Sequence, residues 1–187
     1  MSSLETNASR SNGHGPGLLT DGRGRGRGLY SAVERRRRDG TRWTLVQGVL
    51  APVQFLVFLV SLGLVVRAIL TGEGHGAAMA SVIVKTLVLY TIMVTGSIWE
   101  KVVFGKWLFA PAFFWEDVVS MGVIALHTAY VVMALAGYGT ATEQLLVALV
   151  AYAAYAINAA QFVLKLRAAR LEGVPATAGA GAREVPA

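Results

Sequence analysis

Four long apolar runs alternate with short polar or glycine-rich segments along this sequence. Each run has roughly 20 residues, the length an α-helix needs to span about 30 Å of hydrocarbon. Gly105 and Pro111 bracket the middle connection, and glycine-rich segments separate the other neighbouring runs. The runs lie near Thr44 to Val66, Ala77 to Trp99, Val118 to Tyr138 and Gln144 to Leu164. The pattern predicts an all-α integral membrane protein with helices at about 44–70, 77–104, 113–138 and 142–168.

The polar segments outside the runs divide the chain further. Residues 1–28 form a Gly/Arg-rich tail, 29–43 a basic juxtamembrane segment, 44–171 the four-helix transmembrane domain and 172–187 a second tail. Both tails are expected to be disordered, since they cannot bury enough apolar surface to fold alone. The cluster from Arg35 to Arg38 suits anionic lipid headgroups at about 1 kcal/mol per cation, and it equally suits a topogenic signal that binds nothing. No aromatic residue interrupts the Arg-Gly run, so we expect no nucleic-acid partner.

The basic residues predict how the helices are oriented. Nine of the 17 Lys and Arg residues precede Trp43, two lie in the middle connection and four follow Leu164. Those 15 residues fall on one side of the membrane, and basic loops stay in the cytoplasm. All four tryptophans map to the same side, as an interfacial aromatic belt would. We therefore predict an antiparallel four-helix transmembrane bundle with both termini cytoplasmic.

Composition removes several classes of function. The chain has no cysteine, which excludes disulfides, thiolate metal sites and cysteine nucleophiles. His127 alone among the three histidines lies inside a predicted span, so one chain cannot supply two axial histidines to a haem. No dinucleotide, phosphate-binding or zinc-protease motif occurs. If the protein is an enzyme, we expect an acid–base catalyst without a cofactor.

Polar side chains inside the predicted spans point to a site. In the predicted orientation, eight of them fall in the cytoplasmic half of the bundle: Gln47, Ser97, Glu100, Glu116, Asp117, Ser120, Asn158 and Gln161. Polar groups within a membrane are costly and usually face the bundle interior. The spacing agrees, because Gln47, Gln54 and Ser61 repeat every seven residues. We predict one polar layer that forms a pocket open to the cytoplasmic side.

The charged residues of this layer suggest acid–base chemistry. Glu100, Glu116 and Asp117 flank the middle connection, and together they favour a proton donor near neutral pH. Ordinary interfacial charges at helix ends are the alternative for each of them. His127 lies about 16 Å deeper than Glu116 at 1.5 Å per residue, as a ligand or as a hydrogen-bonded core histidine. Lys85 is expected to reach toward the outer face, with pairing to an acidic ligand as the alternative.

Extended strings of the sequence resemble the 3-vinyl bacteriochlorophyllide hydratase family of bacteriochlorophyll biosynthesis. The similarity runs from about Leu29 to Leu171. It is carried by Arg42-Trp-Thr-Leu-Val-Gln47, Thr95-Gly-Ser-Ile-Trp-Glu-Lys-Val-Val-Phe-Gly105, Phe109-Ala-Pro-Ala-Phe-Phe-Trp-Glu-Asp-Val-Val-Ser120 and Ala125-Leu-His-Thr-Ala-Tyr130. The resemblance implies a hydro-lyase that adds water to the C3 vinyl group of chlorophyllide a or 3-vinyl bacteriochlorophyllide a, giving a 3-(1-hydroxyethyl) group. It also implies a multi-pass protein of the bacterial inner or intracytoplasmic photosynthetic membrane.

The resemblance assigns no catalytic residue, but the polar layer fits this reaction. We hypothesise that Glu116 or Glu100 is the acid and that Asp117 orients or deprotonates the water. In the same hypothesis, Asn158 and Gln161 hold the water or a ring carbonyl. The remaining substrate-binding candidates are Trp99 and Trp115, which would stack on the chlorin, Lys101 for its propionate, His127 for its magnesium, and Gln47.

Other readings remain open at this point. A pigment-binding or assembly protein would use the same aromatics and His127 but would not need clustered acids. A small transporter would draw on midspan Gln54 and Lys85, although no inverted repeat is evident. The choice between chlorin and bacteriochlorin substrate is also open. A bundle this small would enclose a tetrapyrrole only in part, so a homo-oligomer or a neighbouring enzyme of the pathway is an expected partner.

Overall fold

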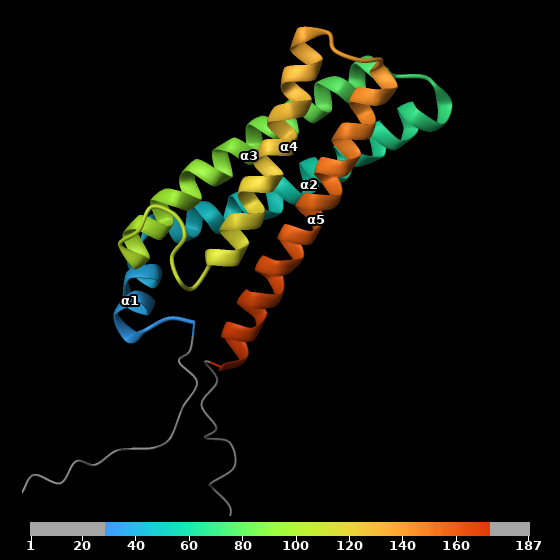
Figure 1. The fold of residues 1–187 in the computed structure, drawn as a ribbon. Helices are drawn as coiled ribbons and strands as arrows, with labels where there is room; N and C mark the ends of the chain where they lie inside the picture. Colours follow the sequence, from blue (N-terminus) through green and yellow to red (C-terminus); the bar gives the residue numbers. More distant parts are fainter. Residues whose placement is uncertain (1–28, 173–187) are drawn as a thin grey trace, which may run out of the picture.

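The fold is all-helical over residues 29–172, the part of the chain that the structure, a computed structural model, describes. Five helices occur there: α1 (Ala32–Gly40), α2 (Arg42–Thr71), α3 (His75–Phe104), α4 (Phe114–Ala136) and α5 (Ala141–Glu172) (Figure 1). The last four are long and apolar enough to cross a membrane, which confirms the prediction of four long apolar helices. The expected tails at 1–28 and 173–187 lie outside the described residues.

Local sequence signals explain where the helices begin and end. Thr41 caps α2 by accepting a hydrogen bond from the Trp43 N–H at 3.3 Å. The helices α3 and α4 stop at Gly105 (φ 79°) and Gly137 (φ 68°), in the left-handed conformation that glycine adopts without strain. α1 is an element that the apolar pattern does not predict. Ser31 begins it with a capping box.

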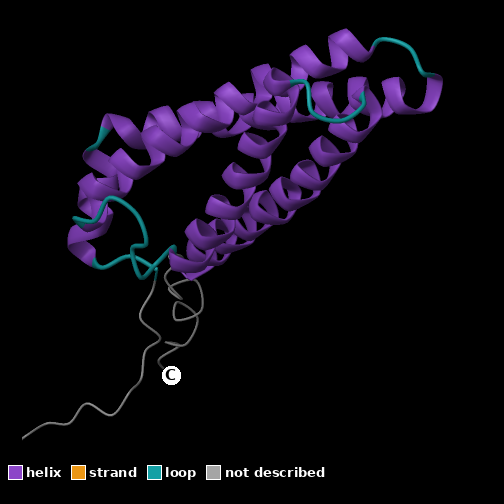
Figure 2. Ribbon diagram, turned by 45° about the horizontal axis from the view of Figure 1, so that its top comes forward, coloured by secondary structure: helices purple, strands orange, loops and turns teal. Residues whose placement is uncertain are grey.

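The four long helices pack as two pairs. α2 packs chiefly against α3 and α4 chiefly against α5, with fewer contacts between the pairs. Figures 1 and 2 show the pair α4–α5 inclined to the pair α2–α3. Hydrogen bonds of 2.7 Å from Gln47 to Thr95 and between Ser61 and Ser81 set the register of α2 on α3. The connection 105–113 joins the two pairs and therefore lies where their residues can meet.

Most of the apolar surface faces outward. Large side chains such as Leu56, Val60 and Leu135 are 62%, 65% and 78% exposed. A water-soluble protein would bury such residues, whereas a bilayer accepts them. The buried positions instead include an unusual number of polar groups, which identifies the interior as the place to look for function.

Candidate active site

Three carboxyl groups meet at the connection between α3 and α4. Glu100 lies in the last turns of α3, and Glu116 and Asp117 lie in the first turn of α4. They are 5%, 8% and 3% exposed. The connection folds back over them, which brings the three carboxyls into one buried cluster. We call Glu100, Glu116 and Asp117 the carboxyl cluster.

Two members of the cluster hold the connection through its backbone. The Ala110 N–H donates to Glu100 Oε2 at 3.2 Å, and the Phe109 N–H donates to Asp117 Oδ2 at 2.8 Å. The Glu100 and Asp117 carboxyls also lie close enough to interact electrostatically with each other. Phe109 has φ 58°, a conformation that costs a bulky residue of order 1–3 kcal/mol. The strain at Phe109 is offset locally by its bond to Asp117.

The third carboxyl is tied to α5. Lys165 Nζ lies 2.6 Å from Glu116 Oε2 and forms an ion pair with it. Asn158 Nδ2 donates to the backbone carbonyl of Glu116 at 3.0 Å, while Ser120 Oγ donates to Asn158 Oδ1 at 3.2 Å. Five members of the predicted polar layer thus lie together across α3, α4 and α5: Glu100, Glu116, Asp117, Ser120 and Asn158.

An aromatic cluster packs beside this network, around the connection 105–113 and the start of the described chain. Phe113 stacks on Phe162 with ring centroids 5.9 Å apart, and Trp99 meets Phe113 edge-on at 5.7 Å. Tyr30 lies over Phe104 at 5.8 Å. Trp99 donates through Nε1 to Thr44 Oγ1 at 2.9 Å, so its indole is held in place on α2. Among the predicted stacking residues, Trp99 therefore belongs to the interior.

The structure places the other predicted binding residues farther out. Trp115 is 69% exposed, and Lys101 is exposed and donates to the Gly105 carbonyl at 3.0 Å. Gln47 is half-buried against α3 through its bond to Thr95. Gln161 is half-buried, and its Oε1 atom is enclosed without a hydrogen-bond partner among the described residues. These four residues border the network but do not bond to it.

A second polar cluster lies deeper, around Lys85 and His127. Both residues are 0% exposed, and Lys85 Nζ lies 2.6 Å from His127 Nε2. His127 Nδ1 lies 2.8 Å from the Val123 carbonyl, which makes it the N–H donor and leaves Nε2 to accept from Lys85. The expectation that Lys85 reaches the outer face is therefore wrong. The aromatic ring of Tyr155, 4.0 Å from Nζ, gives the amine a favourable partner inside the bundle.

The hydrogen bonds of His127 make it a poorer candidate for a metal ligand than the sequence suggests. Both of its ring nitrogens already have partners, so Lys85 would have to move before Nε2 could bind a metal. Nearby, the Tyr152 hydroxyl lies 2.5 Å from Ser61 Oγ, which is 2.7 Å from Ser81 Oγ. This deeper cluster has the features of a satisfied core network.

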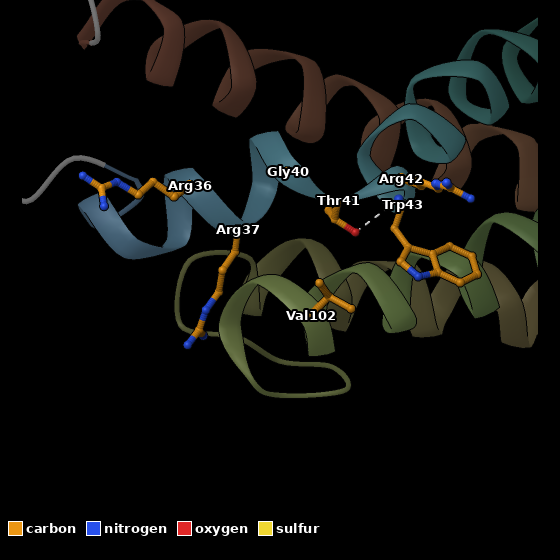
Figure 3. A pocket seen from close by; sticks show the side chains of 7 residues that line it. All are labelled: Arg36, Arg37, Gly40, Thr41, Arg42, Trp43 and Val102. Carbon is orange, nitrogen blue, oxygen red and sulfur yellow. Dashed lines mark hydrogen bonds between the residues drawn. The ribbon is translucent and has the colours of Figure 1, made fainter.

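A basic groove at the start of α2 is a separate feature. Its lining includes Arg36, Arg37, Arg42, Trp43 and Val102 (Figure 3). Figure 3 shows that the arginine side chains point in different directions and do not converge on one spot. Such a spread suits a surface of anionic headgroups better than one small ligand.

On the neighbouring face of α1, Arg38 lies over the Tyr30 ring at 4.7 Å. Burial raises the pKa of the Tyr30 phenol above its ordinary value, although the Arg38 guanidinium opposes that shift. Tyr30 therefore stays a neutral aromatic anchor between α1 and the aromatic cluster.

Sequence reasoning missed two residues of the site. Lys165 was counted only as an orientation signal, although it follows Asn158 by seven residues and so shares its helix face. That spacing was a usable signal. The left-handed backbone of Phe109 has no comparable sequence signal, because nothing in the residue type indicates a positive φ.

Comparison with known proteins gives consistent matches. A family model described as 2-vinyl bacteriochlorophyllide hydratase matches residues 30–168. A 2-vinyl bacteriochlorophyllide hydratase of Cereibacter sphaeroides is 64% identical over 146 residues, which cover 78% of this chain and 91% of that protein. The protein of the same name from Rhodobacter capsulatus is 63% identical over 151 residues, covering 81% and 88% of the two chains. No solved structure matches this chain.

Proposed function

Because the chain belongs to the 2-vinyl bacteriochlorophyllide hydratase family, we propose that it adds water to the vinyl group of a chlorophyllide or bacteriochlorophyllide. The product carries a 1-hydroxyethyl group in place of the vinyl. We take the 2-vinyl group of the family description to be the C3 vinyl group discussed above. The observation that supports a reaction, rather than pigment storage, is the carboxyl cluster, since binding a pigment does not require three buried acids.

The reaction needs one proton donor and one proton acceptor. A carboxylic acid transfers its proton to the terminal vinyl carbon, and the π electrons form the new C–H bond. The cation left on the adjacent carbon is delocalised into the macrocycle. Water then forms a C–O bond there and loses a proton to a carboxylate, so that one water is added and the acid–base pair is restored.

Glu100 and Asp117 suit these two roles. Two neighbouring buried carboxyls cannot both carry a charge without strong repulsion, so we assign one proton to the pair. In our assignment Glu100 carries that proton and Asp117 is the carboxylate. Glu116 is a weaker candidate for the acid, because protonation would cost it the ion pair with Lys165. Its role is then to fix α5 beside the pair.

The other site residues are assigned to the substrate. Asn158 and Gln161 border the carboxyl cluster and would hold the water or a ring carbonyl. Trp99 and Gln47 would contact the macrocycle from α3 and α2. Lys101 and Trp115 are exposed beside the connection, where they would meet the propionate and outer ring edge of an entering pigment. His127 could bind the magnesium of the pigment only if Lys85 moved away from its Nε2 atom.

We further propose an antiparallel bundle with both termini in the cytoplasm. The short α2–α3 and α4–α5 connections and the bias of basic residues toward one side support that topology. The inner or intracytoplasmic photosynthetic membrane is the location that suits the pathway. Enclosure of a whole tetrapyrrole would call for a second copy or another enzyme of the pathway at the exposed apolar faces.

Dark incubation with pigment tests the function directly. Membranes that contain the expressed chain are given 3-vinyl chlorophyllide a or its bacteriochlorin analogue, and the absorption band and pigment mass are followed. A blue shift with the mass gain of one water is expected. If well-folded protein retains both pigments unchanged, the chain is a pigment-binding protein and the hydratase proposal is wrong.

A further inference from the structure

Three arginines of the basic groove at the start of α2 have no acidic partner. Arg36, Arg37 and Arg42 are exposed, and none of them forms an ion pair among the described residues. The nearby Asp39 pairs with Arg38 instead, at 2.8 Å. The groove therefore presents uncompensated positive charge to whatever lies against it (Figure 3).

An exposed apolar strip continues from the groove along α2. Leu45, Val49 and Leu56 follow Arg42 at successive spacings of three, four and seven residues, so the four share one helix face. All three apolar side chains are exposed. A ligand on this face meets a cation first and an apolar surface next. That order suits an anion with a hydrocarbon tail, whereas a free phosphate would use only the cations.

The level of the groove along the helices also suits a lipid headgroup. Trp43 lines the groove and is half-buried there, and tryptophan is enriched where a membrane meets water. In the proposed orientation this end of the bundle faces the cytoplasmic leaflet, whose anionic lipids attract basic segments. The charge, the tail and the depth therefore favour the same ligand, an anionic phospholipid.

The groove is linked to the carboxyl cluster through Thr44. The Thr44 hydroxyl donates to the Arg38 carbonyl of α1 at 2.6 Å and accepts from Trp99 Nε1 of α3 at 2.9 Å. Trp99 directly precedes Glu100 in the chain and packs in the aromatic cluster beside the connection 105–113. A shift of α1 is therefore passed to the residue next to the proposed acid.

We propose that the basic groove binds the headgroup of an anionic phospholipid, and that this lipid supports turnover by holding α1 in place against α2 and α3. The binding site stands apart from the proposed function, whereas the effect on turnover rests on it. The groove arginines are positioning residues, because they act through α1 and Thr44 and not on the pigment.

Lipid binding is measured on the full chain in a neutral detergent. Phosphatidylglycerol is added, with phosphatidylcholine as the neutral comparison, and retained lipid is counted by native mass spectrometry. Arg37→Gln combined with Arg42→Gln should weaken phosphatidylglycerol binding roughly 30-fold, at about fivefold for each cation. High salt should weaken binding to the unmodified chain, because it screens exposed charges.

The matched control is Arg167→Gln combined with Arg170→Gln. It removes the same charge from exposed positions near the end of α5, which lies at the same end of the bundle as α1 (Figure 1). Since these two arginines lie outside the groove, the control should keep the phosphatidylglycerol affinity of the unmodified chain.

Turnover is compared in nanodiscs of phosphatidylcholine with and without phosphatidylglycerol. The anionic lipid should raise hydration by the unmodified chain about fivefold or more, the lower end of usual coupling between sites. It should not activate the Arg37→Gln and Arg42→Gln double variant, which should equal the unmodified chain in phosphatidylcholine alone. Thr44→Val should bind the lipid normally but lose the activation, because it keeps the shape without the hydroxyl. Thr44→Ser should keep both.

Three results would overturn the inference. One is hydration that does not respond to phosphatidylglycerol, since the arginines would then only orient the chain in the membrane. Another is an equal loss of lipid affinity in the groove variant and the α5 control, which would show a response to total charge. The third is a higher KM for pigment in the groove variant in phosphatidylcholine alone, since the groove would then bind the pigment carboxylate. If the unmodified chain hydrates in neither lipid, the proposed function is refuted, and the lipid count alone decides the binding site.

Discussion

Glu100 and Asp117 accept hydrogen bonds from consecutive backbone N–H groups, those of Ala110 and Phe109. The connection 105–113 is thus pinned at its centre to α3 by one bond and to α4 by the other. The same two carboxyls also interact electrostatically with each other. Any change that alters one acid therefore acts on the chemistry, the other acid and the connection together.

Replacing Glu100 by Gln should remove the proton donor. Turnover should fall about 10²–10⁴-fold, the usual contribution of a general acid, while pigment affinity changes little because the shape is kept. Asp117→Asn should lose turnover to a similar extent. Glu116→Gln is the comparison, and its loss should be smaller. Single-turnover rates and pigment titrations measure both quantities, and a larger loss in Glu116→Gln would exchange the roles of the two glutamates.

Lys165→Met should destabilise the protein by leaving the Glu116 carboxylate unpaired. We expect a cost of roughly 1–3 kcal/mol, below the value for a fully buried pair because the Lys165 side chain is 26% exposed. Adding Glu116→Gln to Lys165→Met should restore most of the stability. Unfolding in mild detergent provides the double-mutant cycle, and additive effects of the two changes would show that the ion pair contributes nothing.

Phe109 provides a test of the strained connection. Phe109→Gly should hold φ near 58° without strain and fold within about 1 kcal/mol of the original chain, since it loses the ring contact with Phe114. Phe109→Val should be less stable by a further 1–2 kcal/mol or so, because a β-branched residue resists positive φ. Thermal melts of the two variants are compared, and equal stability would mean that the conformation carries no strain.

The hydrogen-bond partners of His127 predict whether magnesium in the pigment affects binding. Since Lys85 and the Val123 carbonyl occupy both ring nitrogens, pigment with and without magnesium should bind with similar affinity. His127→Ala should destabilise the fold but should leave the ratio of the two pigment affinities unchanged. Fluorescence titration with the two pigments decides the matter. A selective loss of affinity for the magnesium form in His127→Ala would show that the histidine is released to act as a ligand.

The lack of cysteine allows the topology to be mapped one position at a time. Glu73→Cys lies in the α2–α3 connection and Lys106→Cys in the α3–α4 connection. In intact spheroplasts, an impermeant maleimide should label the cysteine at 73 at once and that at 106 only after permeabilisation. The reverse pattern would place the carboxyl cluster on the outer side of the membrane.

Regular features of the chain were predictable because they depend on helix geometry. The four spans follow from length and hydropathy. The approach of Glu100 to Asp117, and of Asn158 to Ser120, follows from the depth of these residues in neighbouring spans. The contact between Lys85 and His127 does not follow from these signals. It depends on how the helices rotate against each other, which a single sequence pattern leaves undetermined. The backbone of Phe109 is fixed by tertiary hydrogen bonds and has no local sequence signal.

The site draws on both helix pairs, and this has a consequence for biogenesis. The chain emerges from the ribosome N-terminus first, so α2 and α3 enter the bilayer while Asn158 and Lys165 are still being synthesised. Glu100 meets Asp117 when α4 arrives, and Glu116 gains its cation when α5 docks. A chain that stops before α5 therefore has the Glu100–Asp117 pair but lacks Asn158 and the cation that pairs with Glu116. We expect such a chain to be inactive, so that pigment reacts only on the finished enzyme.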